Sequence, residues 1–179
     1  MESFAQQEIS VTAVIINYKT RDLTRRAITT FRAFYPSLPL LLIDNGSDDE
    51  STAMIRDLAD RSPHATRAIL NHQNLHHGPA MDQALRSADT SYVLFIDSDC
   101  EITREGFIER MISLTKEYSN GYAAGKRVWI NRRGFDTDKS ENAYEYIRPI
   151  CMLIQRERYL MLPPFERHGT PCLQNMIEA

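Results

Sequence analysis

Short apolar segments with the length of buried strands alternate with segments of helical periodicity along the first hundred residues. The strand-like segments are 9–17, 40–43, 67–70 and 92–96, and they are rich in aliphatic and β-branched side chains. Between them, apolar residues recur at helical spacing in 21–34, 51–59 and about 79–88. This alternation predicts an α/β fold, with a mostly parallel sheet that is covered by helices on both faces.

The second part of the chain continues the pattern less regularly. It predicts a helix at 104–118, strands at 122–130 and 147–154, a polar loop at 131–142 and a short helix at 156–162. Thr170 and Pro171 favour the start of a last helix, with Thr170 as its cap. Because that helix reaches Ala179 without a capping signal, we expect a C-terminally truncated domain.

Length and charge exclude several classes of protein. At 179 residues the chain suits one domain, and its net charge of −3 argues against a nucleic-acid partner. Its three cysteines form no C-x-x-C pair, which favours a reducing compartment. No apolar run has the length of a transmembrane segment, and the N-terminus lacks a signal-peptide pattern. We therefore expect a cytoplasmic protein, with a peripheral position at a membrane as the alternative.

Polar side chains follow three of the predicted strands. Asn17 and Tyr18 end the first strand, Asp44 ends the second, and Asp97 and Asp99 follow the fourth. In parallel α/β sheets, ligands bind beyond the carboxyl ends of the strands. The sequence therefore predicts a binding site that contains three carboxylates and an aromatic ring.

The spacing Asp97-x-Asp99 offers hard oxygen ligands that suit Mg²⁺ or Mn²⁺. The alternative is a solvated loop in which Thr103 or Asp99 caps the next helix. Asp44 can accept hydrogen bonds from a nucleobase or simply form a turn, and Tyr18 can stack on a base or pack in the core.

Other site signatures are missing or weak. The chain has no G-x-G-x-x-G turn, no G-x-x-x-x-G-K-[ST] phosphate loop and no G-x-S-x-G nucleophile motif. His168 with Cys151 and Cys172 fits no familiar zinc spacing.

Four motifs in order carry a family resemblance. They are V-I-I-N-Y at 14–18, I-D-N-G-S-D-D at 43–49, N-L-H-H-G-P-A-M-D at 74–82 and F-I-D-S-D at 95–99. Together they resemble the family 2 glycosyltransferases, which have the GT-A fold, a Rossmann-like three-layer α/β/α sandwich. The resemblance implies a single GT-A domain over 1–179, with a donor-binding half at 1–100 and an incomplete acceptor-side half at 101–179.

The family resemblance implies an enzyme that moves a sugar from a nucleoside-diphosphate sugar to an acceptor hydroxyl, with inversion and a divalent cation, Mn²⁺ or Mg²⁺. The donor is a UDP-, dTDP- or GDP-sugar, and the acceptor a glycan, a lipid-linked sugar or another hydroxyl compound. Asp97 and Asp99 match the metal-binding D-x-D pair, with Asp97 also near the ribose and Asp99 counted as catalytic. The other substrate-binding residues implied by the motifs are Asn17, Tyr18, Asp44, Asn74, His77 and Asp82. The His-His-Gly form of the third motif departs from the commoner Asn-x-Gly pattern.

Inversion requires a base for the acceptor proton, and Glu166 is the best-placed late acid. The usual Glu-Asp pair is absent, and Glu166 can instead pair with Arg167 or solvent. His168 can add a metal contact or pack in its loop.

The main alternative is a catalytically inactive nucleotide-sugar-binding or interaction module of the same fold. A haloacid dehalogenase phosphatase is disfavoured, because its D-x-D motif follows the first strand. A nucleotidyltransferase is disfavoured because it needs a glycine-rich loop after the first strand. Two basic pairs, Lys126-Arg127 and Arg132-Arg133, suit a solvated face or an anionic acceptor.

Overall fold

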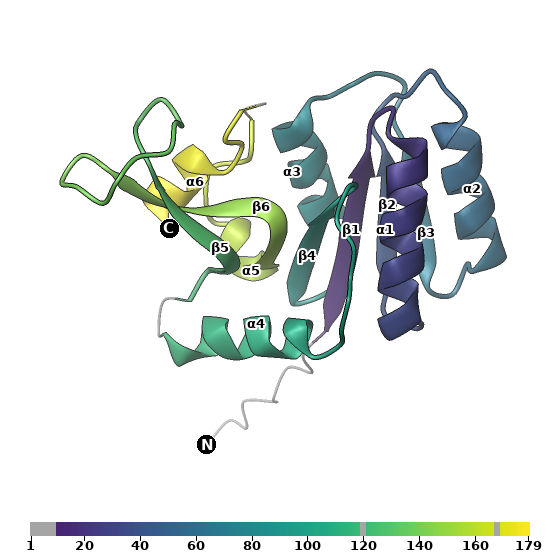
Figure 1. Ribbon diagram of the computed structural model, residues 1–179, viewed down its shortest axis with the longest axis horizontal. Coiled ribbons are helices and arrows are strands. Elements are labelled where there is room, and N and C mark those ends of the chain that lie inside the picture. Colours follow the sequence, from purple (N-terminus) through teal and green to yellow (C-terminus); the bar gives the residue numbers. More distant parts are fainter. Residues whose placement is uncertain (1–9, 119–120, 167–168) are drawn as a thin grey trace.

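The structure is a computed structural model that describes residues 10–118, 121–166 and 169–179 (Figure 1). Strands and helices alternate along most of the chain. In order, they are β1 (Val11–Asn17), α1 (Arg21–Phe34), β2 (Leu40–Asp44), α2 (Ser51–Arg61), β3 (Thr66–Leu70), α3 (His77–Ser87), β4 (Tyr92–Asp97), α4 (Phe107–Glu117), β5 (Ala123–Ile130), β6 (Tyr144–Gln155), α5 (Arg156–Tyr159) and α6 (Leu173–Glu178).

The six strands form one sheet in the order β3-β2-β1-β4-β6-β5. The strands β3, β2, β1 and β4 are parallel, whereas β6 runs antiparallel to both β4 and β5. Asn17 pairs with Asp44, and Ile16 pairs with Asp97. The prediction of a mostly parallel sheet is confirmed, and the carboxyl ends of β2, β1 and β4 meet at one edge.

Helices cover both faces of this sheet (Figure 1). Successive side chains of a strand point to opposite faces, so neighbouring residues of β1 enter different cores. One core contains Ile15 of β1 together with Phe31 of α1. Ile55 of α2 and Met111 of α4 belong to the same core. A second core fills the opposite face, which α3 covers.

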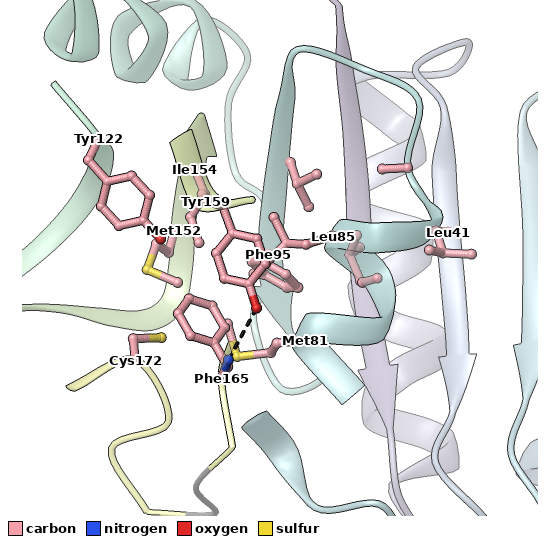
Figure 2. Packing of buried hydrophobic residues seen from close by; sticks show 14 of the residues in the cluster. Leu41, Met81, Leu85, Phe95, Tyr122, Met152, Ile154, Tyr159, Phe165 and Cys172 are labelled. Carbon is pink, nitrogen blue, oxygen red and sulfur yellow. Dashed lines mark hydrogen bonds between the residues drawn. The ribbon is translucent and has the colours of Figure 1, made fainter. Parts of the chain in front are cut away.

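The second core joins α3 to the C-terminal segments (Figure 2). Met81 and Leu85 of α3 belong to the same buried cluster as Tyr159 of α5, Phe165 and Cys172. The rings of Tyr159 and Phe165 meet edge to face, with their centroids 4.8 Å apart. Burial of these large side chains fixes the chain after α5 against α3.

Two predicted helix starts are wrong. Helix α4 begins at Phe107 rather than 104, because Gly106 has a φ of +85° and forms its N-cap. Neither Thr103 nor Asp99 caps it. Helix α6 begins at Leu173 with Cys172 as its N-cap, and Thr170 has a left-handed φ of +47° that does not suit a cap.

Strand β6 is longer than the predicted 147–154 because it pairs with two neighbours. Its first residues, from Tyr144, pair with β5, and its last residues pair with β4 as well. The register of the β5–β6 hairpin shifts between Gly125 and Lys126. This irregularity bends the hairpin away from the parallel strands (Figure 1).

Candidate functional site

A cavity of about 320 Å³ lies at the edge where β1 and β4 end. It brings together five of the residues predicted from the sequence, from three separate motifs. The complete lining consists of Ile16, Tyr18, Thr20, Leu23, Asn45, Asn74, His77, Asp97, Ser98 and Asp99.

Asp97 and Asp99 give the cavity its charge. Asp97 is half-buried at the end of β4, and Asp99 is exposed two residues later. Burial, and then the negative charge of Asp99, raise the pKa of Asp97 from 3.8 to about 6. The lining contains no lysine or arginine, so no permanently charged cation of the cavity lining offsets these two acids.

Two carboxylates in a cavity without lysine or arginine fit a divalent cation. Within the described part of the chain, however, no group of three or more His, Cys, Asp and Glu side chains could hold an ion. Among the described residues, the site therefore offers a cation the two carboxylates of Asp97 and Asp99, and water or substrate can supply further ligands.

Asn17 is completely buried behind the cavity. Its amide nitrogen donates to Asp44 Oδ1 at 2.9 Å and to Ser47 at 3.1 Å. Its carbonyl oxygen accepts hydrogen bonds from the hydroxyls of Thr20 at 3.1 Å and Thr24 at 2.8 Å. Asn17 has 0% of its surface exposed, so a substrate cannot touch it in this conformation. Its predicted contact with substrate stays a prediction. It ties the turn after β1 to the turn after β2.

Asp44 is also buried, with 1% of its surface exposed. Its Oδ1 accepts the bond from Asn17, and its Oδ2 accepts one of 2.5 Å from the Thr52 hydroxyl. A nucleobase can reach this carboxylate only if one of these groups moves. Contact between Asp44 and a base stays a prediction, whereas Tyr18 of the same predicted pair lines the cavity and is 41% exposed.

Asn45 is a site residue that the sequence reasoning missed. Its amide nitrogen donates to Asn74 Oδ1 at 3.0 Å and to the His76 carbonyl at 3.3 Å. Its oxygen accepts bonds from the Asn71 side chain and the Leu75 amide. The signal was its place in the second motif, directly after a strand-end acid. Asn45 fixes the loop before α3 to the end of β2.

Gly46 lets the same two loops approach closely. A Cβ at this position would lie 2.2 Å from the carbonyl carbon of Gln73, and the φ of Gly46 is +78°. Only glycine accepts both conditions. The glycine of the second motif is therefore a packing requirement of the site.

Thr20 and Ser98 were also missed. The hydroxyls of Thr20 and Ser98 are hydrogen-bonded to each other at 3.1 Å, and Ser98 lies between Asp97 and Asp99. This bond joins the start of α1 to the turn that carries both acids. Isolated hydroxyl residues in turns give no distinctive sequence signal, which is why neither was predicted.

The loop before α3 holds His76 in an unusual conformation. His76 has φ 67° and ψ 170°, a region that is almost restricted to glycine. Its amide donates to Asn74 Oδ1 at 2.7 Å. The strained turn places His77, the first residue of α3, in the cavity lining, so the N-terminus of α3 lies at the cavity.

Asp82 does not line the cavity. Its carboxylate accepts a hydrogen bond of 2.6 Å from the Tyr159 hydroxyl and forms an ion pair with Arg86 at 2.9 Å. The observed partners of Asp82 are therefore protein side chains, and Tyr159 links α3 to α5. The predicted contact of Asp82 with substrate stays a prediction.

Glu166 is exposed and follows the buried Phe165, but it is not part of the cavity lining. Phe165 donates its amide hydrogen to the Tyr159 hydroxyl at 3.1 Å (Figure 2). Tyr159 in turn contacts Asp82, five residues after His77 on α3. The predicted metal ligand His168 lies outside the described residues.

A larger hollow of about 470 Å³ adjoins the cavity at the start of α1. Its charged side chains are largely paired with one another or with neighbours: Lys19 with Asp48, and Arg21 with Asp22 and Glu50. The smaller cavity is the better candidate for a ligand site, because its two acids form no ion pair with any described residue.

The family comparison matches the profile described as "Glycosyl transferase family 2" to residues 12–176 of the chain. The chain belongs to glycosyl transferase family 2. The matched range includes the whole cavity lining and every predicted site residue. The resemblance that rested on four motifs is confirmed.

Solved structures show that this glycosyl transferase family 2 chain has the GT-A fold. The mannosyltransferase PcManGT from Pyrobaculum calidifontis, in complex with GDP-Man and Mn²⁺, aligns with a TM-score of 0.69 at 16% identity. S. aureus TarS 1–349 in complex with UDP-GlcNAc aligns with a TM-score of 0.64 at 13% identity. GalNAc-T7 with UDP, GalNAc and Mn²⁺ gives a TM-score of 0.64 at 13% identity.

These alignments cover 89% of the family 2 chain for PcManGT and 93% for the other two. They cover 48%, 53% and 37% of those proteins, so this chain spans about half of their length or less. A comparison with curated proteins gave no match. Among the described helices, none combines the length and apolar content that crossing a bilayer requires.

Proposed function

We propose that the chain transfers a sugar from a nucleoside-diphosphate sugar to an acceptor hydroxyl. The observation that carries this proposal is the placement of Asp97 and Asp99 in a cavity whose lining contains no lysine or arginine. A diphosphate cannot bind beside two carboxylates unless a cation offsets the repulsion. A divalent cation bound by the two carboxylates would attract the diphosphate of a nucleotide sugar, so the same cavity can hold both.

The proposed cofactor is Mn²⁺ or Mg²⁺, held by Asp97 and Asp99. Two of the similar structures contain Mn²⁺, which supports a divalent cation. When bound, the cation stabilises the negative charge that develops on the leaving diphosphate. The two carboxylates hold it at the point where β4 ends.

Tyr18 is the proposed platform for the nucleobase. Its ring is 41% exposed and belongs to the cavity lining, and an exposed aromatic ring can stack on any base. Asn45 and Asn74, which are hydrogen-bonded to each other, supply polar groups in the same cavity. The similar structures hold GDP-Man in one case and UDP-GlcNAc in another, so guanine, uracil and thymine donors are all candidates.

Glu166 is the proposed general base, and the proposed stereochemistry is inversion. Its segment is attached to α3 through Phe165, Tyr159 and Asp82, and α3 starts at the cavity with His77. Asp82 and His77 are five residues apart, which is about 7.5 Å along a helix. The chain can therefore present Glu166 on the side of the cavity where α3 begins.

The direct test is an assay of nucleotide release. The chain would be incubated with Mn²⁺, with UDP-, dTDP- and GDP-sugars, and with a panel of glycan and lipid-linked acceptors. We expect release from donors of one base only, and an inverted anomeric configuration in the product. Glu166→Gln should lower kcat about 10²-fold or more without changing donor binding. Glu141→Gln, a change of an exposed acid in the 131–143 loop, is the matched control and should have no effect.

Two results would contradict the proposal. Retention of configuration would exclude a single inverting displacement with Glu166 as its base. Nucleotide binding without release on any acceptor would instead indicate a donor-binding module without transferase activity.

A further inference from the structure

The turn that joins β5 to the loop before β6 has a fixed backbone. Asn131 donates its amide hydrogen to the Phe135 carbonyl at 2.9 Å. The Asn131 side-chain oxygen accepts bonds from the backbone amides of Arg133 at 2.9 Å and Phe135 at 3.2 Å. Gly134 closes the turn with a φ of +88°. The backbone at Arg132, between these residues, is therefore held in one conformation.

The same turn packs against the segment that follows Glu166. A Cβ placed on Gly134 would lie 2.4 Å from the Thr170 hydroxyl, so the side chain of Thr170 packs closely against Gly134. Thr170 is four residues from Glu166, and four residues span at most about 14 Å. Arg132 therefore lies within the length of a short oligosaccharide from the proposed base.

A cavity of about 280 Å³ lies between this turn and α6. Its lining combines apolar surface with a few polar groups: Arg132, Tyr144, Leu173, Gln174 and Ile177. Ile177 leaves 41% of its surface exposed there. An aromatic ring, aliphatic side chains and a small number of polar groups are typical of a site for a small ligand such as a sugar.

The charge of this cavity comes from Arg132. On the same hairpin, Arg127 pairs with Glu145, and Arg148 pairs with Asp136. Across the described ranges, no hydrogen bond or ion pair engages the guanidinium of Arg132. A guanidinium presents paired N–H donors that match a carboxylate or phosphate.

Three further acids belong to the segments around this cavity. Asp138 and Glu141 are exposed in the loop beyond the turn. Glu178 of α6 accepts a hydrogen bond from the side chain of Gln174, and so it lies beside the lining. It holds Gln174 in place and weakens the attraction of the cavity for an anion.

We propose that this cavity binds an acidic sugar unit of the acceptor, with Arg132 holding its carboxylate or phosphate. The inference rests on the proposed transferase function, because it identifies the cavity as part of the acceptor site. Tyr144 and Ile177 contact the face of the sugar ring, and Gln174 contacts its hydroxyls. The accepting hydroxyl lies on a neighbouring unit, toward Glu166.

The test is an NMR titration of the ¹⁵N-labelled 179-residue chain. The probes are glucuronate and glucose 6-phosphate, with glucose as the neutral control, so that the two anionic arms separate carboxylate from phosphate recognition. We expect at least one acidic sugar to shift the signals of Arg132 and Gln174, while glucose does not. Arg132→Gln should weaken that binding about tenfold or more, because it removes a charge-assisted hydrogen bond.

Two variants serve as matched controls. Arg133→Gln removes the same charge from the adjacent position, which is outside the lining, and should weaken binding far less than Arg132→Gln. Glu178→Gln removes the negative charge that is hydrogen-bonded to Gln174 and should strengthen binding. Equal shifts with glucose, no shifts with either acidic sugar, or equal losses in both arginine variants would overturn the inference.

The same samples keep this inference separate from the proposed function. UDP, dTDP and GDP would be added with Mg²⁺, which is diamagnetic and leaves the signals sharp, and the signals of Asn45, Asn74 and Ser98 would be followed. Nucleotide binding without acidic-sugar binding contradicts the inference alone. Acidic-sugar binding without nucleotide binding contradicts the proposed function. The cavity at Arg132 would then bind acidic sugars in a protein that is not a sugar-nucleotide transferase.

Discussion

The hydroxyl of Tyr159 donates a hydrogen bond of 2.6 Å to Asp82 and accepts one of 3.1 Å from the Phe165 amide. Tyr159 has none of its surface exposed, and its ring packs on Phe165. One buried oxygen thus connects α3, α5 and the segment that ends at Glu166. Asp82, which the sequence suggested as a substrate ligand, belongs to this support.

Tyr159→Phe keeps the ring and removes both hydrogen bonds. We expect a loss of about 1–3 kcal/mol in the free energy of unfolding, because the Phe165 amide and Asp82 Oδ1 each lose a hydrogen-bond partner. Denaturant unfolding measures this loss. If the segment positions Glu166, kcat should fall while the affinity for nucleotide stays constant.

Tyr146→Phe is the matched control for this prediction. Tyr146 is equally buried in the same core, but its hydroxyl has no hydrogen-bond partner among the described residues. Its removal should be neutral or stabilising. Equal losses in the two variants would mean that the Tyr159 hydrogen bonds contribute nothing specific.

Asp97→Asn should stabilise the metal-free chain at high pH. Because the pKa of Asp97 in the folded chain is raised from 3.8 to about 6, the folded state binds this proton more tightly than the unfolded state does. The wild-type chain therefore loses stability as the pH rises through this range, and the loss is complete above it. The variant should melt higher at pH 8, by about 2–4 °C for each ~1 kcal/mol regained.

Thermal melts in chelator at pH 8 and pH 4.5 measure this effect, and the gain should shrink at the lower pH. Added Mn²⁺ should reverse the order at pH 8, because only the wild-type chain keeps both carboxylates. A variant that melts lower than wild type in chelator at pH 8 would show that the ionised Asp97 carboxylate is not destabilised by burial and by the charge of Asp99.

His76→Gly should raise stability. The observed φ of 67° and ψ of 170° cost a histidine about 1–3 kcal/mol, and glycine adopts them freely. The extra flexibility of glycine in the unfolded chain costs about 0.5–1 kcal/mol, which leaves a net gain of about 1 kcal/mol. The backbone contacts of residue 76 to Asn74 and Asn45 do not require its side chain.

His72→Gly controls for the flexibility term, because His72 is exposed and its φ is not positive. It should lower the free energy of unfolding by about 0.5–1 kcal/mol. Unfolding in urea compares the two variants directly, and equal losses in both would contradict the assignment of strain to His76.

Asn45→Asp should loosen the loop before α3. The new carboxylate oxygen would face Asn74 Oδ1 and the His76 carbonyl, which are both acceptors. We expect a loss of about 2 kcal/mol or more in the free energy of unfolding, together with weaker nucleotide binding. Asn142→Asp, a change in an exposed loop, should affect neither quantity. Unchanged nucleotide affinity in Asn45→Asp would show that this loop is not part of the donor site.

The sequence was most informative where local signals and tertiary structure agree. Helix α1 has the predicted bounds, Arg21–Phe34, because its apolar spacing, and the proline two residues after its end, coincide with its packing. Helix α4 starts late because Gly106 adopts a left-handed conformation that its neighbours do not reveal. Strand β6 extends beyond its apolar core, because pairing with β5 orders polar residues as well.

The same distinction applies to the site. The positions of Asp97 and Asp99 followed from a strand end, which periodicity identifies. The burial of Asn17 and Asp44 could not be predicted in this way. A strand end indicates where a residue lies in the sheet, but it does not indicate which groups surround its side chain. Asp82 acquires its partner Tyr159 from 77 positions away, and no local pattern indicates such a contact.

The most direct test of the donor site is calorimetric titration of the chain with UDP, dTDP and GDP, each with and without Mn²⁺, at pH 7.5. We predict that one nucleotide binds, that Mn²⁺ tightens its binding about tenfold or more, and that Asp99→Asn abolishes this gain. Binding that is equal with and without Mn²⁺, or no binding of any nucleotide to the folded chain, would contradict the assignment of this cavity as a metal-dependent nucleotide-sugar site.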